Sequence, residues 1–218
     1  MFFIRLFLSV LLVFPLFVNA QTADNGVFVY TVWYKHTPTQ QMNILLSDTI
    51  FVYNKIGVEK VMRSVDTVMN NELLSRKTTL EKYYRINFDK REFQDLGKEL
   101  TYKKDAGLPF TSPKVGIDFR YKYYNGEKYV ATDTTIDHKS CKVIRYVANS
   151  DSPLNGGRIT IVLLKMRNKF IHIIPNLEDT FNGRLLKFDA IDNNNGRIFL
   201  IMDHIPQLSD YWKKIISR

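Results

Sequence analysis

The sequence predicts a mainly β fold of the α+β class, built on one curved antiparallel sheet or open half-barrel. Runs of β-branched and aromatic residues recur along the chain, and residues of this kind favour strands. Short segments rich in Asn, Gly and Pro separate these runs, which is typical of tight turns. From residue 116 to 204 the runs follow one another with few long connections, as in an antiparallel meander.

The sequence predicts a hairpin at residues 183–205, and we expect this hairpin to form the middle of the sheet. Two β-rich runs, residues 184–191 and 197–202, flank the turn at residues 192–196, read Asp-Asn-Asn-Asn-Gly. The second run is apolar on both faces, so we expect it to lie centrally. The turn superficially resembles a calcium-binding loop, but its Gly stands one position early and an apolar strand follows at once, which favours a hairpin turn.

Residues 1–20 predict a cleaved signal peptide. Arg5 gives the positive start, residues 6–18 are almost wholly apolar, and Ala20 places cleavage before Gln21. A retained membrane anchor is the alternative, although the apolar run is short for a bilayer of about 30 Å. We therefore expect export to the periplasm, the outer-membrane surface or the medium, which argues against a nucleic-acid partner.

The mature chain is expected to form a single domain over residues 21–218, a length that suits one core. The full chain carries a net charge of +9, and removal of Arg5 with the leader leaves +8. Such a charge favours anionic surfaces and also keeps an exported protein soluble. The chain has one cysteine, Cys141, so packing rather than a disulfide must stabilise the domain.

Several elements are predicted before residue 116. Residues 26–35 form a first strand, which pairs with residues 42–46, and residues 49–53 form another short strand. Apolar residues between positions 56 and 74 recur at spacings of three and four, which favours a helix, with split strands as the alternative. The later predictions are a strand at 79–88, a charged and less regular segment at 90–104, and a surface loop with two prolines at 106–114.

The second half is predicted to begin with a hairpin around Asn125-Gly126, between strands at residues 116–124 and 128–134. Further strands are expected at 140–148 and 158–166, with loops at 149–157 and 175–182. Residues 208–216 predict a short closing helix after Pro206. The helices at 56–74 and at the C-terminus are expected to fill the concave face of the sheet.

Four stretches of the sequence share motifs with one known family. They are the leader end Ala20-Gln21, the charged-aromatic residues 121–130, the segment Ile136-Asp137-His138-Lys139-Ser140-Cys141-Lys142-Val143, and Ile173-Ile174-Pro175. Through these stretches the chain resembles the GLPGLI family of exported Bacteroidetes proteins. Gly183, Leu185 and Leu186 stand where the family's name motif ends. His138 replaces the family's Gly, Lys139 replaces its aromatic residue, and residues 176–182 replace the name motif itself. The resemblance implies an exported β-rich fold and no established reaction, and the architecture is also similar to periplasmic half-barrel lipoprotein carriers.

Catalytic and metal-binding patterns are sparse. Cys141 and His138 are the one nucleophile–base pair close in sequence, but in a strand they would point to opposite faces, so a Cys-dependent hydrolase would need His172 or His204. Otherwise a lone Cys in a β-rich run is a buried small hydrophobe. The four histidines show no metal spacing, and the carboxylate pairs Glu178-Asp179 and Asp203 with its neighbouring His204 show no flanking pattern for catalysis. We expect no cofactor and no metal.

The most informative surface pattern is the alternation of cationic and aromatic residues, which we call the cationic–aromatic face. Cations alternate with rings in residues 82–85 and 120–124, and a strand would place Arg120, Lys122 and Tyr124 on one face. The predicted ligand-binding residues are Arg120, Lys122, Tyr124, Lys82 and Arg85, and the alternative is a solvated sheet face.

The function expected from the sequence is therefore a non-catalytic binding or carrier protein of the cell envelope. Its partner would be an anionic lipid, a glycan or another envelope protein, with peripheral contact to a membrane. The alternatives are a structural or assembly component that docks to another envelope protein and, more remotely, the Cys-dependent hydrolase.

Overall fold

A computed structural model describes residues 24–36, 42–69, 72–102, 106–150, 154, 156–166 and 171–218, and the side chains of these residues except 66–69 and 72–74. The predicted signal peptide at residues 1–20 and its cleavage site before Gln21 lie outside the described residues.

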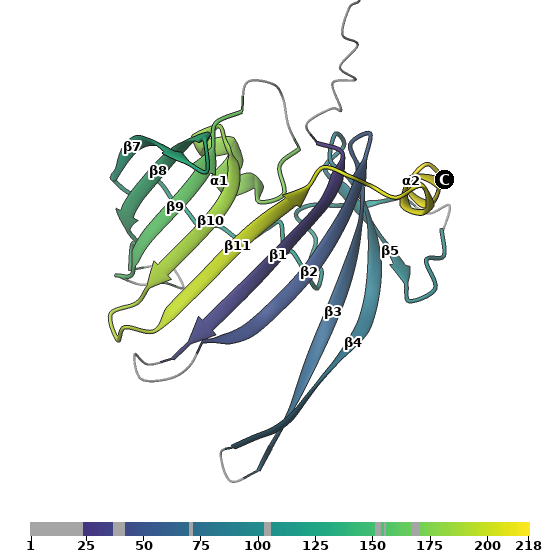
Figure 1. Cartoon of the computed structure of the whole chain (residues 1–218), viewed down its shortest axis with the longest axis horizontal. Helices are drawn as coiled ribbons and strands as arrows, with labels where there is room; N and C mark the ends of the chain where they lie inside the picture. The colour runs from purple at the N-terminus through teal and green to yellow at the C-terminus, as the bar shows by residue number, and fades with distance from the viewer. Residues whose placement is uncertain are drawn as a thin grey trace, which may run out of the picture.

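The described residues form one open antiparallel sheet of 11 strands (Figure 1). This confirms the predicted mainly β fold with a curved, unclosed sheet. The strands are β1 (Gly26–Lys35), β2 (Asn43–Tyr53), β3 (Ile56–Met69), β4 (Glu72–Asn87), β5 (Glu92–Gly97), β6 (Leu108–Pro109), β7 (Tyr129–Ile136), β8 (Lys139–Val147), β9 (Arg158–Leu164), β10 (Arg184–Ile191) and β11 (Arg197–Ile205).

The sheet consists of two meanders that meet at the strands nearest the chain ends. Its order is β6-β5-β4-β3-β2-β1-β11-β10-β9-β8-β7, so β1 to β6 run outward to one edge and β7 to β11 run back from the other. The two halves join because β1 pairs with β11 over nine residue pairs, from Val27 with Ile205 to Lys35 with Arg197. The predicted hairpin of β10 and β11 and the central place of β11 are confirmed.

The main core lies on one side of the sheet, which we call the inner face. It is formed by fully buried side chains such as Phe28, Ile50, Ile86, Ile161 and Phe188. Two segments pack on it. The first is the segment 110–128, which connects the two opposite sheet edges and which we call the crossover; it buries Ile117 and Phe119. The second is helix α1 (Pro175–Phe181), which buries Leu177.

Helix α2 (Asp210–Ile216) covers part of the opposite side, which we call the outer face. Its Trp212 ring stacks on Phe51 of β2 at 3.8 Å between centroids, and Ile215 and Ile216 pack with Val58 of β3. Ser209 caps the helix, because its side chain accepts a hydrogen bond from the Trp212 N–H. The predicted closing helix is thus confirmed, but it does not lie with the main core on the inner face as expected.

The predicted helix at residues 56–74 is wrong, and the alternative of split strands is correct. Residues 56–69 form β3, and β4 begins at Glu72. The apolar spacing is not a strict alternation because both faces of β3 are covered. Val58 is buried under α2, whereas Val61 and the charged Glu59 are buried under the crossover.

The predicted hairpin around Asn125-Gly126 is also wrong. Residues 129–136 form β7 as expected, but residues 116–124 contain no strand. Asp118 turns the chain locally, since its carboxylate accepts a hydrogen bond from the Arg120 N–H at 3.0 Å and its carbonyl accepts one from the Tyr121 N–H at 3.1 Å. Gly126 does adopt the expected positive φ, but the turn ends the crossover rather than joining two strands.

Four smaller features differ from prediction. The strands expected at 42–46 and 49–53 are one strand, β2, and the charged segment at 90–104 contains β5. The loop expected at 175–182 is helix α1, with Pro175 in its first turn and Asn182 in the left-handed conformation at its C-terminus. Within the loop expected at 106–114 the structure places the two-residue edge strand β6.

Candidate anion-binding pocket

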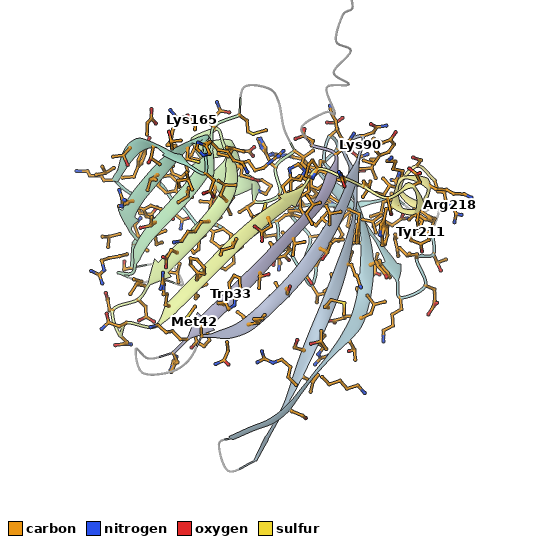
Figure 2. The ribbon with its side chains drawn as sticks, in the orientation of Figure 1. Trp33, Met42, Lys90, Lys165, Tyr211 and Arg218 are labelled. Carbon is orange, nitrogen blue, oxygen red and sulfur yellow. The ribbon has the colours of Figure 1, made fainter. Side chains whose placement is uncertain are left out.

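A pocket of about 640 Å³ lies where the β4–β5 turn, the crossover and the start of α1 meet. We call it the cationic pocket. Four basic side chains line it without any carboxylate among the lining residues, which are Lys90, Arg91, Pro109, Phe110, Thr111, Phe119, Arg120, Tyr121, Lys122, Pro175 and Asn176. Lys90 stands at the end of the sheet where the turn between β4 and β5 lies (Figure 2).

Two of the four cations are held in place by acidic neighbours outside the lining. Arg91 pairs with Asp179 of α1, which also binds the His172 ring, so the β4–β5 turn is tied to the helix. Arg120 pairs with Asp118, with 2.6 Å from Nη2 to Oδ2, and this contact lowers the pKa of Asp118. Lys90 and Lys122 are exposed and form no ion pair with another described residue, so their charges are available to a ligand.

Aromatic rings form the apolar part of the pocket. Phe110 and Phe119 stack at 3.8 Å between ring centroids, and Tyr121 lies 4.4 Å from Tyr123. The half-buried Phe110 and the exposed Tyr121 offer ring surface to the apolar side of a sugar or to an acyl chain, whereas Phe119 is buried beneath Phe110 and supports it. The pocket therefore combines positive charge with an apolar surface, the composition that suits an amphipathic anion.

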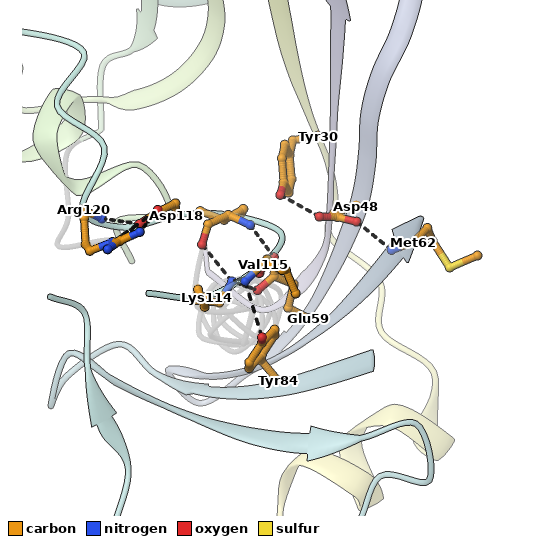
Figure 3. Close-up of polar contacts among 10 residues, drawn as sticks. Tyr30, Asp48, Glu59, Met62, Tyr84, Lys114, Val115, Asp118 and Arg120 are labelled. Atoms are coloured by element: carbon orange, nitrogen blue, oxygen red, sulfur yellow. Dashed lines mark hydrogen bonds and ion pairs between the residues drawn. The ribbon is translucent and has the colours of Figure 1, made fainter. Parts of the chain in front are cut away.

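A buried polar cluster holds the crossover beneath this pocket (Figure 3). The Lys114 ammonium donates to Glu59 Oε2 at 2.5 Å and to the Ile117 carbonyl at 2.8 Å, and the side chains of this ion pair are fully buried. The Ile117 N–H donates to the other Glu59 oxygen at 2.8 Å. One carboxylate of β3 thus fixes both a side chain and the backbone of the crossover.

Asp48 and Tyr30 extend the cluster into β2 and β1. The Tyr30 hydroxyl donates to Asp48 Oδ2 at 2.9 Å, and the Met62 N–H donates to Asp48 Oδ1 at 3.0 Å (Figure 3). Burial raises the pKa of Tyr30, of Asp48 and of Glu59, and Lys114 opposes the rise for the two carboxyl groups. The sequence placed Lys114 at the end of a surface loop, but its side chain is buried because the crossover packs over β3 and pairs Lys114 with Glu59.

The structure brings only part of the predicted cationic–aromatic face together. Arg120 and Lys122 line the cationic pocket, but they do so from an irregular segment rather than from a strand. The Tyr124 ring instead packs against Phe181 and Tyr146, and its hydroxyl donates to the Glu127 carbonyl at 2.8 Å. Tyr124 therefore supports the inner face and is not part of the pocket lining.

Lys82 and Arg85 lie elsewhere, on β4, and point to opposite faces of the sheet. The Lys82 ammonium pairs with Asp95 at 2.6 Å, which raises the pKa of Lys82. Arg85 follows Tyr83 on the outer face, where Tyr83 contacts Trp212. Neither residue lines the cationic pocket, whereas Lys90 and Arg91, which sequence reasoning did not single out, do.

The residues considered for catalysis are dispersed. Cys141 is fully buried with Val143 and Val162, which confirms the expectation of a small buried hydrophobe. His138 lies in the β7–β8 turn with a positive φ, and His172 contacts Asp179. His204 stacks on Phe28 at 4.3 Å, and burial lowers its pKa.

Glu178 and Asp179, adjacent in sequence, have different environments. Asp179 lies at the surface, whereas Glu178 is fully buried and accepts hydrogen bonds from the backbone N–H groups of Ile174 at 2.7 Å and Leu185 at 2.8 Å. Burial raises the pKa of Glu178 to about 7. The carboxylate thus fastens α1 to β10, a role that no sequence pattern indicated.

Among the described residues, no group of three or more His, Cys, Asp or Glu side chains is placed to hold a metal ion. No helix in that part of the chain has the length and apolar character needed to cross a membrane. Comparison with known protein families and with curated proteins finds no match to this chain.

Proposed function

We propose that this chain is an exported, non-catalytic binding protein whose ligand carries an anionic group held in the cationic pocket. The ligand class is an anionic lipid or a charged glycan, because both combine negative charge with a surface that packs on aromatic rings. The observation that carries the proposal is the lining itself, with four cations, a stacked pair of Phe rings and no carboxylate.

The proposal places the ligand at the rim of the sheet and not inside a half-barrel cavity. The crossover occupies part of the inner face with its own side chains, since Ile117 and Phe119 are buried there and the Tyr123 ring packs on Phe188 at 5.0 Å. A carrier that enclosed an acyl chain at this position would have to displace the crossover and break the buried Lys114–Glu59 pair.

Two pairs of probes test the proposal. Cosedimentation compares vesicles of phosphatidylglycerol and phosphatidylcholine with vesicles of phosphatidylcholine alone, and calorimetry compares dextran sulfate with dextran. We expect binding to one or both anionic probes and none to the neutral ones. The lipid and glycan arms separate the two ligand sources.

A charge-matched pair of variants locates the site. Lys90→Gln/Lys122→Gln is expected to weaken binding of the anionic probe about tenfold or more, since each Lys near an anionic surface contributes about 1 kcal/mol. Lys77→Gln/Lys214→Gln removes the same charge from β4 and α2 and should change binding less than twofold, because both side chains are exposed and lie outside the pocket. Equal losses in the two variants, or no binding to either anionic probe, would refute the proposal.

A further inference from the structure

Strand β7 forms an unprotected edge of the sheet. All eight of its residues are exposed, and among the described residues it pairs only with β8, from Tyr129 with Tyr146 to Ile136 with Lys139. Its sequence, Tyr-Val-Ala-Thr-Asp-Thr-Thr-Ile, is rich in β-forming residues and contains no Lys, Pro or Gly, and its register contains no bulge. Its one charged residue, Asp133, pairs with Lys165 at 2.6 Å.

The opposite edge is built differently. There the last strand, β6, has two residues, and one of them is Pro109, which has no N–H to donate. Sheet proteins commonly protect their edges with short strands, Pro, inward charges or bulges, because a free edge pairs with other chains. Only one of the two edges of this sheet has such protection, so the free backbone groups of β7 are available to another strand.

A hollow with positive charge adjoins β7 on the outer face. Its volume is about 890 Å³, and its lining includes three exposed cations, Lys128, Arg145 and Arg158, together with the exposed Val130 and Val147. The three cations form no ion pair with another described residue. The carboxylate in the lining, Glu127, is buried and accepts hydrogen bonds from the Asn125 N–H at 2.7 Å and the Asn149 N–H at 3.3 Å.

We propose that the edge of β7 binds an extended segment of a partner protein by β-augmentation, and that this segment carries carboxylate side chains. An added strand lies about 4.8 Å from β7, and its alternate side chains project on the outer face beside Val130. Arg145 of β8 pairs with Val130 of β7. Its long side chain extends past β7 toward the side chains of the added strand. Backbone pairing supplies the affinity, and the cations select Asp or Glu.

The charges favour such a partner over a second copy of this chain. Pairing of β7 with a second copy would bring together two chains that each carry a net charge of +9, and like-charged chains repel each other. A segment that carries carboxylates instead meets the cations beside β7 with opposite charge.

The probe is a capped eight-residue peptide of alternating Glu and Thr, with its neutral Gln–Thr counterpart as control. Fluorescence anisotropy is expected to show binding of the acidic peptide and at least tenfold weaker binding of the neutral one. Two further versions carry N-methyl groups either on every Glu or on every Thr. Because alternate residues of a strand direct their N–H groups to opposite sides, one version should lose binding and the other should keep it.

Protein variants complete the test. Lys128→Gln/Arg145→Gln should weaken the acidic peptide about tenfold, whereas Lys77→Gln/Lys214→Gln should change its affinity less than twofold. Lys90→Gln/Lys122→Gln should leave peptide binding unchanged, which separates this edge from the cationic pocket. Absence of binding, equal binding of the two N-methylated peptides, or dimerisation of the chain alone with exchange protection of the β7 amides would overturn the inference.

Discussion

Lys114 is the side chain that anchors the crossover most directly. Its ion pair with Glu59 is fully buried, so removing the ammonium leaves a carboxylate without its counter-charge in the core. We expect Lys114→Met to lower the free energy of unfolding by about 3–5 kcal/mol in urea titrations. The double variant Lys114→Met/Glu59→Gln should recover at least half of the loss, because Gln is neutral and still accepts from the Ile117 N–H.

The matched control for this prediction is Lys77→Met. Lys77 is exposed on β4, so the change should stay within about 0.5 kcal/mol of the parent chain. A similar small effect of Lys114→Met would contradict the anchoring role.

The raised pKa of Glu178 predicts that the free energy of unfolding changes measurably with pH. Its pKa is about 7 in the folded chain against an ordinary value of 4.5, so between these values the folded state holds a proton that the unfolded state has lost. The resulting stabilisation is fully present below pH 4.5 and is lost as the pH rises through 7. A shift of this size corresponds to about 3 kcal/mol.

The measurement is the free energy of unfolding of the parent chain minus that of Glu178→Gln, from about pH 4 to about pH 9. The difference should fall as the pH rises and become constant above about pH 8, because Gln does not titrate. A difference that does not change with pH would show that Glu178 has an ordinary pKa. Subtraction removes the contributions of Asp48 and Glu59, whose pKa values burial also raises.

At the scale of elements, the crossover depends on the glycine at its tightest approach to the sheet. Gly116 has φ +79°, and a Cβ there would lie 2.4 Å from Glu59 Oε1 and 2.8 Å from Val61. We expect Gly116→Ala to lower the free energy of unfolding by about 3 kcal/mol or more, since it adds a clash in the core to the backbone strain.

Gly126 separates the two contributions. Its φ is +88°, but a Cβ there would meet nothing within 4 Å, so Gly126→Ala carries only the backbone cost of about 1 kcal/mol. Equal losses for the two alanine variants would mean that the crossover does not pack against Glu59 as described.

Local patterns predicted the elements that are stabilised by local pairing. The β10–β11 hairpin and its turn were predictable because Asp192 and Gly196 form the turn within five residues, with the Gly196 N–H donating to Asp192 Oδ1 at 2.8 Å. Strand β3 was not predictable from its local pattern, because Val58 and Val61 are buried by segments distant in sequence. Helix α1 carried a usable signal in Pro175, which is favoured in the first turn of a helix, and in the i, i+4 pair Leu177 and Phe181, which a helix places on one face.

The cationic pocket was only half predictable for the same reason. Arg120 and Lys122 stood out because cations alternate with rings around them, but the expected strand would have grouped them with Tyr124. Lys90 and Arg91 join them only through the fold, since the β4–β5 turn and the crossover meet in space. No local pattern reports a contact of that kind.

At the scale of the whole molecule, continuous pairing from β6 to β7 predicts that the sheet unfolds as one unit. Trp33 lies on β1 and Trp212 on α2. The variant Trp212→Phe keeps only the Trp33 fluorophore and Trp33→Phe keeps only that of Trp212, so the two variants report on different regions. The urea midpoint seen by fluorescence should coincide in each variant with the midpoint seen by far-UV circular dichroism. Separate midpoints would indicate that the α2 region unfolds independently of the sheet.

The pairing of β1 with β11 also sets the order of events while the chain is being made. Lys35 pairs with Arg197, 162 positions later, so the middle of the sheet is completed only when nearly the whole polypeptide has emerged. Contacts of such long sequence separation slow folding. A nascent chain of this topology stays without its final architecture until its last strand arrives. A truncation before β11 would leave both β1 and β10 as unpaired edges of two half-sheets, instead of one slightly smaller sheet.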